Sequence, residues 1–255
     1  MPGNDRYTKV LLHLNGTDGA TTFPDENYGG SSHVWTAANN AQIDTAEFKF
    51  GGASLLVSSD SGLSGRITTP DSADFTFGSG DFTVDFWFNC IADAALQRWV
   101  TGQSSIGGGS RSFLIRRTSS GVFEATIMDN SSAIVITLTG TTIFLSTTNT
   151  GWHHCALVRA SSIFRLFSDG VQEASGASTA TVNDSTGALW IGGPAVNGIE
   201  WVGWIDEYRM SVDIARWPTS ASFVPPQQQY DSALGFENSA YEERFITAKS
   251  YMREF

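Results

Sequence analysis

Residues 151–173 read GWHHCALVRASSIFRLFSDGVQE, and this stretch decides the fold. Two apolar segments, 152–158 and 163–167, flank a short polar linker, and a third segment follows Asp169-Gly170. That dipeptide is typical of a tight hairpin turn, because glycine adopts a positive φ at little cost. The first segment carries apolar residues on both alternating faces, which is typical of a strand covered on both sides. The stretch therefore predicts three consecutive antiparallel strands inside an all-β sandwich.

The clearest alternation in the chain lies outside this stretch, in residues 81–90, DFTVDFWFNC. We expect Phe82, Val84, Phe86, Phe88 and Cys90 to face the core between two sheets. Further strands are predicted at residues 7–14, 54–57, 66–69, 98–101, 112–116, 122–128, 133–139, 188–191 and 200–210. Short strands at such regular spacing are typical of a sandwich or barrel. The loop of residues 17–40 is long, and such a loop is expected to be functional or to hold an ion.

The composition excludes several classes of function. The net charge is −11 and no Lys- or Arg-rich run occurs, so we expect no binding to nucleic acid. No segment is long and apolar enough to cross a bilayer, and the N-terminus lacks a signal-peptide pattern. Cys90 and Cys155 both fall within predicted strands, where two buried thiols are favoured over a disulfide.

The pattern changes towards the C-terminus. We expect an N-terminal arm (1–6), a sandwich domain (7–225), and a Pro- and Gln-rich exit followed by a C-terminal helix (226–255). Consecutive prolines end the strand pattern, and Ser239 with Glu242 has the spacing of a helix capping box. An apolar seam of the coiled-coil type follows at Tyr241, Phe245, Ala248, Met252 and Phe255. The helix is predicted either to attach or oligomerise the subunit or to fold back on its own sandwich.

Seven short motifs together resemble those of a known family. They are GASLL (52–56), ITTP (67–70), GDFTVDFWF (80–88), WHHCALVR (152–159), FSDG (167–170), LWIG (189–192) and GWIDEYR (203–209). In this order they resemble a concanavalin A-like, laminin G-type jelly roll, which implies two antiparallel sheets packed face to face over residues 7–225. VLLHL (10–14), NAQIDTA (40–46) and the Pro-rich exit are most similar to versions carried by tailed-bacteriophage structural proteins.

Catalysis is not expected. Glucanases of this wider fold carry two carboxylates in a Glu-x-Asp-x-x-Glu strand, and no Glu-x-Asp occurs in this chain. Asp206 and Glu207 are adjacent, so a regular strand would point them to opposite faces. For the same reason His153 and His154 cannot chelate one ion from a regular strand, and we expect them to be packed and hydrogen-bonded.

Two kinds of binding site are candidates. The resemblance implies a Ca²⁺ near a sheet edge, with Asp206 as one ligand and Asp25 or Asp18 as others, unless Asp206 only accepts backbone hydrogen bonds. Carbohydrate binding would use exposed aromatic faces, and eight tryptophans are present. The candidate sugar-stacking residues are Trp35, Trp87, Trp99 and Trp201, while Trp152 and Trp190 are expected in the core.

The sequence thus predicts a non-enzymatic structural or adhesion protein on the virion surface of a tailed phage, on the tail or decorating the head. Its expected partners are host glycan, neighbouring virion proteins and its own copies, with no insertion into a membrane. A glycan-cleaving enzyme with an unrecognised site and a purely architectural module without a ligand are the alternatives.

Overall fold

The computed structural model describes residues 3–231 except 59–64, 92–95, 106–109 and 195–197. Its strands are β1 (Thr8–Leu12), β2 (Thr36–Ala38), β3 (Gln42–Asp44), β4 (Ser54–Val57), β5 (Arg66–Thr69), β6 (Phe82–Cys90), β7 (Arg98–Ser104), β8 (Arg111–Arg117), β9 (Val122–Met128), β10 (Ile134–Ile143), β11 (Trp152–Ala160), β12 (Ile163–Ser168), β13 (Val171–Ala177), β14 (Leu189–Ile191) and β15 (Gly203–Val212). One turn of 3-10 helix, η2 (Ala73–Phe75), precedes β6. No helix in the described ranges has the length and apolar character of a membrane span.

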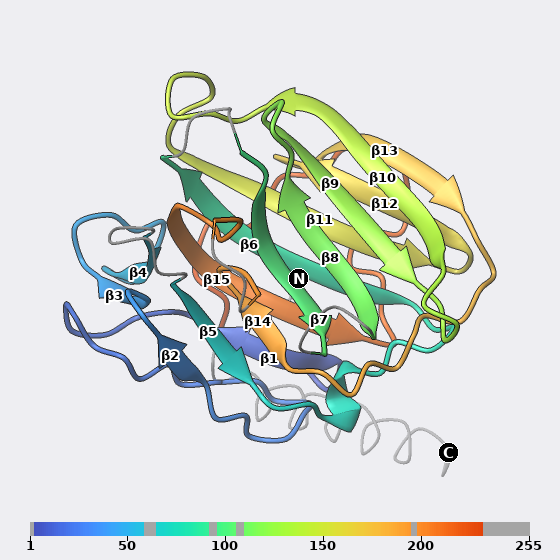
Figure 1. Cartoon of the computed structure of the whole chain (residues 1–255), viewed down its shortest axis with the longest axis horizontal. Coiled ribbons are helices and arrows are strands. Elements are labelled where there is room, and N and C mark those ends of the chain that lie inside the picture. Colours follow the sequence, from blue (N-terminus) through green and yellow to red (C-terminus); the bar gives the residue numbers. More distant parts are fainter. Residues whose placement is uncertain (1–2, 59–64, 92–95, 106–109, 195–197, 232–255) are drawn as a thin grey trace, which may run out of the picture.

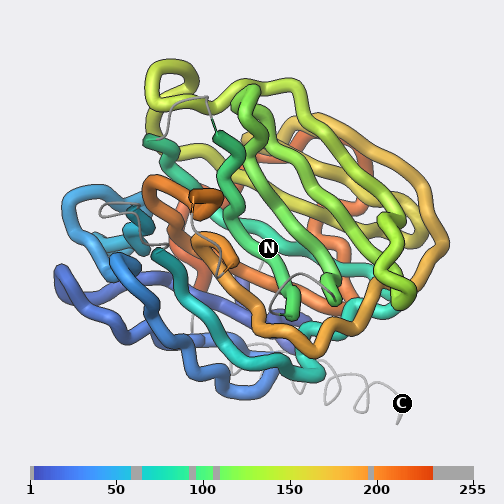
Figure 2. Tube along the Cα trace, in the orientation of Figure 1, coloured from blue at the N-terminus to red at the C-terminus, as the bar shows by residue number. Residues whose placement is uncertain are grey.

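The strands form two layers (Figure 1). An eight-stranded sheet has the order β13-β12-β11-β6-β15-β4-β3, with β1 also paired to β15, and a seven-stranded sheet has the order β10-β9-β8-β7-β14-β5-β2. The pairs within both sheets are antiparallel, as their registers show. The trace in Figure 2 shows the seven-stranded sheet lying across the front of the other. The predicted all-β, two-sheet antiparallel sandwich is confirmed, whereas the predicted C-terminal helix, with Tyr241 to Phe255, lies outside the described residues.

The central stretch folds as predicted. β11 pairs with β12, and β12 with β13, in antiparallel register. Asp169 and Gly170 have φ values of 48° and 78°, the left-handed conformation that a two-residue hairpin turn of this kind needs at both central positions. β11 also pairs with β6, so that it lies inside the eight-stranded sheet.

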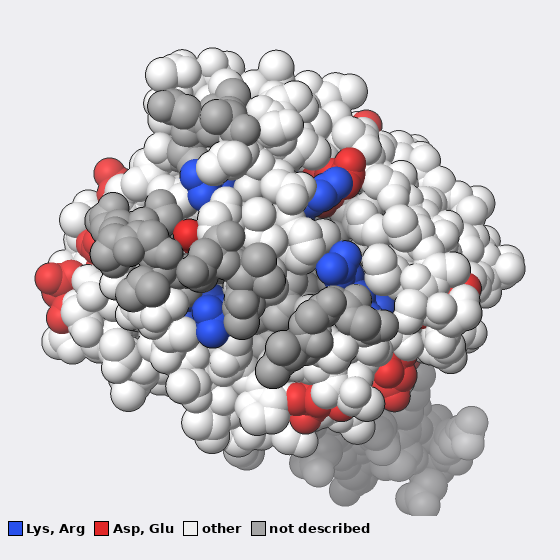
Figure 3. Space-filling model, in the orientation of Figure 1, with Lys and Arg blue, Asp and Glu red and all other residues white. Residues whose placement is uncertain are grey.

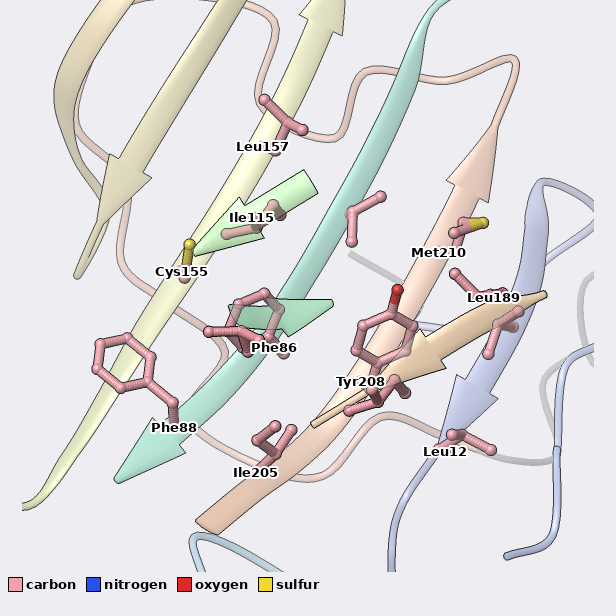
Figure 4. Close-up of a cluster of buried hydrophobic side chains, with 14 of the residues drawn as sticks. Leu12, Phe86, Phe88, Ile115, Cys155, Leu157, Leu189, Ile205, Tyr208 and Met210 are labelled. Carbon is pink, nitrogen blue, oxygen red and sulfur yellow. The ribbon is translucent and has the colours of Figure 1, made fainter. Parts of the chain in front are cut away.

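The inner faces of the sheets form one aromatic-rich core. All five residues of β6 that were expected to point inward are at most 5% exposed. Phe88 contacts the rings of Phe123 (4.5 Å between centroids) and Phe144 (5.1 Å), which belong to the other side of the sandwich. Figure 4 shows Phe86, Cys155 and Tyr208 among the side chains gathered between the layers. Cys90 and Cys155 are buried thiols that are not joined by a disulfide, as predicted.

On the outer face of the eight-stranded sheet, residues that follow β15 pack against β11 and β12 in place of another sheet. Ala156, Val158 and Phe167 pack there against Trp217 and Phe223. The Trp217 and Phe223 rings stack with centroids 4.1 Å apart, and the Phe223 amide donates to the carbonyl of Gly170 in the hairpin turn. This exit segment, residues 213–231, explains why β11 is apolar on both faces.

A buried charge network fastens the N-terminal arm and the segment after β15 to the same face. Asp85 of β6 accepts two hydrogen bonds from the Arg209 guanidinium, at 2.9 and 3.2 Å, and one from the Tyr230 hydroxyl. Arg209 also donates to the carbonyl of Gly3 at 3.0 Å. Arg216 of the exit segment forms two hydrogen bonds with Asp5 of the N-terminal arm, at 2.7 and 2.8 Å. These contacts place the first and last described residues on the outer face of the eight-stranded sheet.

The segment predicted as one long loop, residues 17–40, contains strand β2. Its anchor is Asp25, which accepts the Leu11 amide at 2.9 Å and contacts the His33 ring at 2.8 Å. β2 is only three residues long and has no alternating pattern, so that its pairing with β5 depends on the tertiary fold.

Candidate functional site

The carboxylates proposed as calcium ligands are not brought together. Asp206 is fully buried and accepts the backbone amides of Lys49 and Phe50 at 2.9 and 3.0 Å, which is the alternative role that the sequence left open. Asp25 anchors its loop as described, and Asp18 accepts the Thr45 amide at 3.4 Å. No group of three His, Cys, Asp or Glu residues in the described part of the chain has a metal-binding arrangement. These residues therefore do not fit the calcium site that the resemblance implied.

Asp206 and Glu207 depart from the expectation that they face opposite sides of a strand. β15 shifts register between Asp206 and Arg209, and Glu207 has a φ of 48°. This bulge turns both carboxylates to the outer side, where Glu207 contacts His13 at 2.8 Å and accepts the Tyr230 amide at 2.9 Å. Burial raises the pKa of Asp206 to about 8 despite the amides that it accepts. Both groups are buried and committed to structural hydrogen bonds.

The two histidines of β11 are packed on opposite faces. His153 contacts Asp169 at 2.7 Å and lies against the Phe144 ring, whereas His154 is buried beside Asp85 and Trp217. They do not converge on a shared ion, as the strand geometry predicts.

Three of the four tryptophans proposed for sugar stacking are buried. Trp35 is 5% exposed, Trp87 4% and Trp201 0%. Trp201 lies in the core against Phe88, and Trp87 is covered on the outer face by Lys49, whose ammonium lies 4.0 Å from the ring centroid. Their ring faces already contact the protein, which corrects the expectation that they are available to a ligand. Trp99, the fourth, is partly exposed.

Trp99 belongs to a surface on the outer face of the seven-stranded sheet. Its ring lies beside that of Trp190, with centroids 6.1 Å apart and an interplanar angle of 24°. Trp190 is 3% exposed, and its indole N–H donates to Ser104 at 3.2 Å. Trp190 is thus buried, as expected, but Leu189 and Ile191 face the core between the sheets, so Trp190 points to the outer face. Trp190 is therefore a fixed support beside the partly exposed Trp99.

A glycine shapes the floor of this surface. Gly102 of β7 is the cross-strand partner of Trp190, and a Cβ atom at Gly102 would lie 2.7 Å from Cζ2 of the Trp190 ring. The indole thus lies directly on the backbone of β7, which only glycine permits at this position.

We expect Gly102→Ala to destabilise the domain by about 1–3 kcal/mol, because the added methyl group displaces a packed indole or bends the strand. The measurement is urea unfolding followed by tryptophan fluorescence. Thr137→Ala, an exposed position on the same face, is the control and should change the unfolding free energy by no more than about 0.5 kcal/mol. Equal effects of the two substitutions would contradict this account of Gly102.

Threonines continue the row on which Trp190 lies. Thr68 is the cross-strand neighbour of Trp190 on one side. On the other side, Gly102 and Leu114 come first, and Thr126 and Thr137 follow in the same register row. Side chains of one register row share a face of the sheet, so that Thr68 flanks the indole, while Thr126 and Thr137 lie on the same face three and four strands away.

Two arginines of β8 complete the surface, and their surroundings differ. Arg116, the cross-strand partner of Trp99, bonds to Glu124 at 2.5 and 2.9 Å and to Gln97. The Arg111 guanidinium lies 4.9 Å from the centroid of the Trp99 ring and has no hydrogen-bond or carboxylate partner among the described residues. Burial and the positive charge of Arg116 lower the pKa of Arg111, although an arginine remains charged at neutral pH. No carboxylate of the described residues therefore compensates its charge.

The distribution of charge on this face is uneven. Figure 3 shows Lys and Arg side chains in the middle of the face and Asp and Glu side chains mostly towards its rim, although the chain as a whole carries a net charge of −11. We call Trp99, Arg111, Arg116 and Trp190 the tryptophan–arginine surface. The alternation in LWI (189–191) could have indicated the outward Trp190, but no local pattern indicates that Arg111 reaches Trp99.

A pocket of about 220 Å³ on the opposite side of the sandwich is a weaker candidate. Arg209, Arg216, Trp217 and Tyr230 of the charge network line it. Both guanidinium groups there are already paired with carboxylates of the chain, so that the pocket offers little unused binding capacity.

Comparisons with known proteins agree with the fold. No curated protein shows a match in sequence. The binding domain of Paraclostridial Mosquitocidal Protein 1 superposes with a TM-score of 0.60 at 12% identity, covering 89% of this chain and 50% of that one. The receptor-binding domain of botulinum neurotoxin D superposes with a TM-score of 0.59 at 14% identity, covering 94% of this chain and 53% of that one. The ligand-binding domain of botulinum neurotoxin serotype D, in complex with N-acetylneuraminic acid, superposes with a TM-score of 0.61 at 13% identity, covering 84% of this chain and 50% of that one. The chain spans about half the length of these domains, and identities this low show the fold alone.

A family model matches more than half of the sequence. It is that of the concanavalin A-like lectin/glucanases superfamily, and it covers residues 60–213. This range includes the strands that carry the tryptophan–arginine surface and most of the inner core. The chain therefore belongs to the concanavalin A-like lectin/glucanases superfamily.

Proposed function

We propose that this chain is a non-catalytic, glycan-binding adhesion domain whose ligand lies on the tryptophan–arginine surface. The observation that carries the proposal is the partly exposed Trp99, held beside the buried Trp190 and under Arg111, whose charge no described carboxylate compensates. Aromatic rings offer flat apolar faces to sugar rings, while nearby hydroxyl and guanidinium groups bind sugar oxygens. The threonine row supplies such hydroxyl groups.

Two structural relatives support this class of ligand. One is a botulinum neurotoxin D domain solved with N-acetylneuraminic acid, and another is the subject of a study in which cell entry of the type C toxin depends on two ganglioside molecules. This chain spans about half the length of each of these domains. Their ligands therefore support a glycan as the class of ligand, but they do not indicate where on this chain it binds.

The absence of catalysis is part of the proposal. Asp206 and Glu207 are buried and accept structural hydrogen bonds, which leaves neither carboxylate free to protonate a glycosidic oxygen or attack a sugar. New reducing ends after incubation with a bound polysaccharide would replace the adhesion proposal by the glycan-cleaving alternative.

We further propose that the domain works on the surface of a tailed-phage virion, on the tail or the head, together with neighbouring virion proteins and its own copies. The support is the similarity of residues 10–14, 40–46 and the Pro-rich exit to tailed-phage structural proteins. Immunogold labelling of purified virions tests this location, and labelling confined to infected-cell debris would contradict it.

The binding proposal is tested with Trp99→Ala. We expect this variant to lose at least about tenfold in affinity for any glycan that the native protein binds on an array, about 1.4 kcal/mol, because the sugar loses its stacking partner. Isothermal titration calorimetry gives the affinities.

The matched control is Trp204→Ala, which removes a partly exposed indole from the outer face of the eight-stranded sheet. It should bind like the native protein. An array without binders would favour the purely architectural module, and equal losses in the two variants would place the ligand elsewhere.

A further inference from the structure

We propose that the glycan bound at the tryptophan–arginine surface is acidic, and that Arg111 binds a carboxylate on one of its sugars. This inference rests on the proposed function and adds the chemical class of the ligand. Its evidence is the position of Arg111 over Trp99, with no acceptor for its guanidinium among the described residues.

Four other guanidinium groups of the domain are used by the protein itself. Arg209 pairs with Asp85, Arg216 with Asp5 and Arg116 with Glu124. Arg159 donates three hydrogen bonds, to the carbonyls of Ser161, Gly78 and Ala180 at 3.1 Å each. Each of these groups fastens one part of the fold to another, so that none has the donors to bind a ligand as well.

No carboxylate or carbonyl of the described residues accepts from Arg111, and its Nε atom is buried without a partner. Arg165 also has buried nitrogens without a partner, but it belongs to β12 of the eight-stranded sheet, whereas Arg111 lies over Trp99. The side chain is held over Trp99 by the attraction of the cation for the ring. A partly desolvated charge without a counter-ion, near the second positive charge of Arg116, is an unfavourable arrangement in the free protein. An anion placed beside Arg111 would remove that cost.

The form of the guanidinium favours a carboxylate over other anions. Its planar fork of N–H donors matches a planar carboxylate, which it binds through two parallel hydrogen bonds. A sugar ring packed on the exposed part of Trp99 would bring a carboxylate attached to that ring close to Arg111. Uronic acids and sialic acids both carry such a group, and the surrounding basic side chains of Figure 3 would attract them towards the middle of the face.

The test compares acidic sugars with neutral partners of the same skeleton. The probes are a hyaluronan oligosaccharide against its carboxyl-reduced form, 3′-sialyllactose against lactose, and dextran sulfate against dextran. We expect the native protein to bind the carboxylate member of the first or the second pair at least about tenfold more tightly than its neutral partner. Preference for the first pair identifies a uronic acid, and preference for the second identifies a sialic acid.

Substitutions then connect the preference to the residue. Arg111→Gln should abolish the preference while weaker binding of the neutral sugar remains, and Arg111→Lys should restore it only in part, because an ammonium lacks the planar fork. Arg6→Gln, which removes the same charge from an exposed position of the N-terminal arm, should keep the preference. Unchanged thermal melting of each variant verifies that the fold is intact.

The outcomes separate this inference from the proposed function. Equal affinity for acidic and neutral sugars, with binding that still depends on Trp99, would overturn the acidic ligand and leave glycan binding in place. A preference that survives in Arg111→Gln, or one shown only for dextran sulfate, would also overturn it. If none of the probes or array glycans binds, the proposed function fails, and this inference fails with it.

Discussion

Replacing Asp85 with alanine is expected to destabilise the domain by about 3–5 kcal/mol, the range for breaking a buried ion pair from one side. Asp85 is fully buried and accepts from Arg209, from the Tyr230 hydroxyl and, at 3.4 Å, from His154. Without it, the Arg209 guanidinium remains in the interior without a counter-charge, and the exit segment loses the contact through Tyr230. Urea unfolding at neutral pH measures the loss.

The control for Asp85 is a double-mutant cycle with Arg209→Ala. Once the guanidinium is also removed, no uncompensated charge remains, so that the double variant should lose clearly less than the sum of the two single losses. Additive losses would show that the two side chains act independently and would contradict the network described above.

The same carboxylate gives the native protein a defined response to acid. Burial alone would raise the pKa of Asp85, but the charge of Arg209 and the hydrogen bond from His154 lower it to about 2. An aspartate whose pKa is lower in the folded than in the unfolded state contributes stability above the unfolded value of about 3.9. That contribution is lost as the pH falls from about 4 towards 2. Asp85→Ala should lack this part of the acid-induced loss in unfolding curves recorded across that range.

Replacing Phe88 with alanine is expected to cost about 3–5 kcal/mol, the usual effect of removing a fully buried aromatic ring. Phe88 is 0% exposed, and its ring contacts those of Phe123, Phe144 and Trp201. The variant leaves a cavity between the two sheets that the surrounding rings cannot fill by small movements. Urea unfolding with circular dichroism gives the free energy.

Phe48→Ala is the matched control, because the Phe48 side chain is 46% exposed. It should change the unfolding free energy by no more than about 0.5 kcal/mol. A loss at Phe88 no larger than that at Phe48 would contradict the central place of Phe88 in the core.

The strands other than β2 and β3 could be predicted from the sequence, because side chains of a strand alternate between two faces whatever surrounds them. β6 and β11 follow this rule residue by residue, and Asp169-Gly170 forms the turn that its conformational preferences predict. The same local rule placed Phe82 to Cys90 in the core.

Local patterns could not show what covers each strand. The apolar outer face of β11 indicated a cover but not that Trp217 and Phe223 of the exit segment provide it. Nor could they show that Trp35, Trp87 and Trp201 are buried, since a tryptophan suits a core and a binding surface equally well.

From the sequence by itself, then, came the all-β sandwich, its inward-facing residues and its central hairpins, which depend on interactions between near neighbours. Only the tertiary structure decided that a bulge turns Asp206 and Glu207 to one side, that Gly3 and Tyr230 meet at the Arg209–Asp85 pair, and that Arg111 of β8 reaches Trp99 of β7. The physical reason is that each of these features depends on which strands and segments become neighbours, and no periodic pattern in the sequence records that pairing.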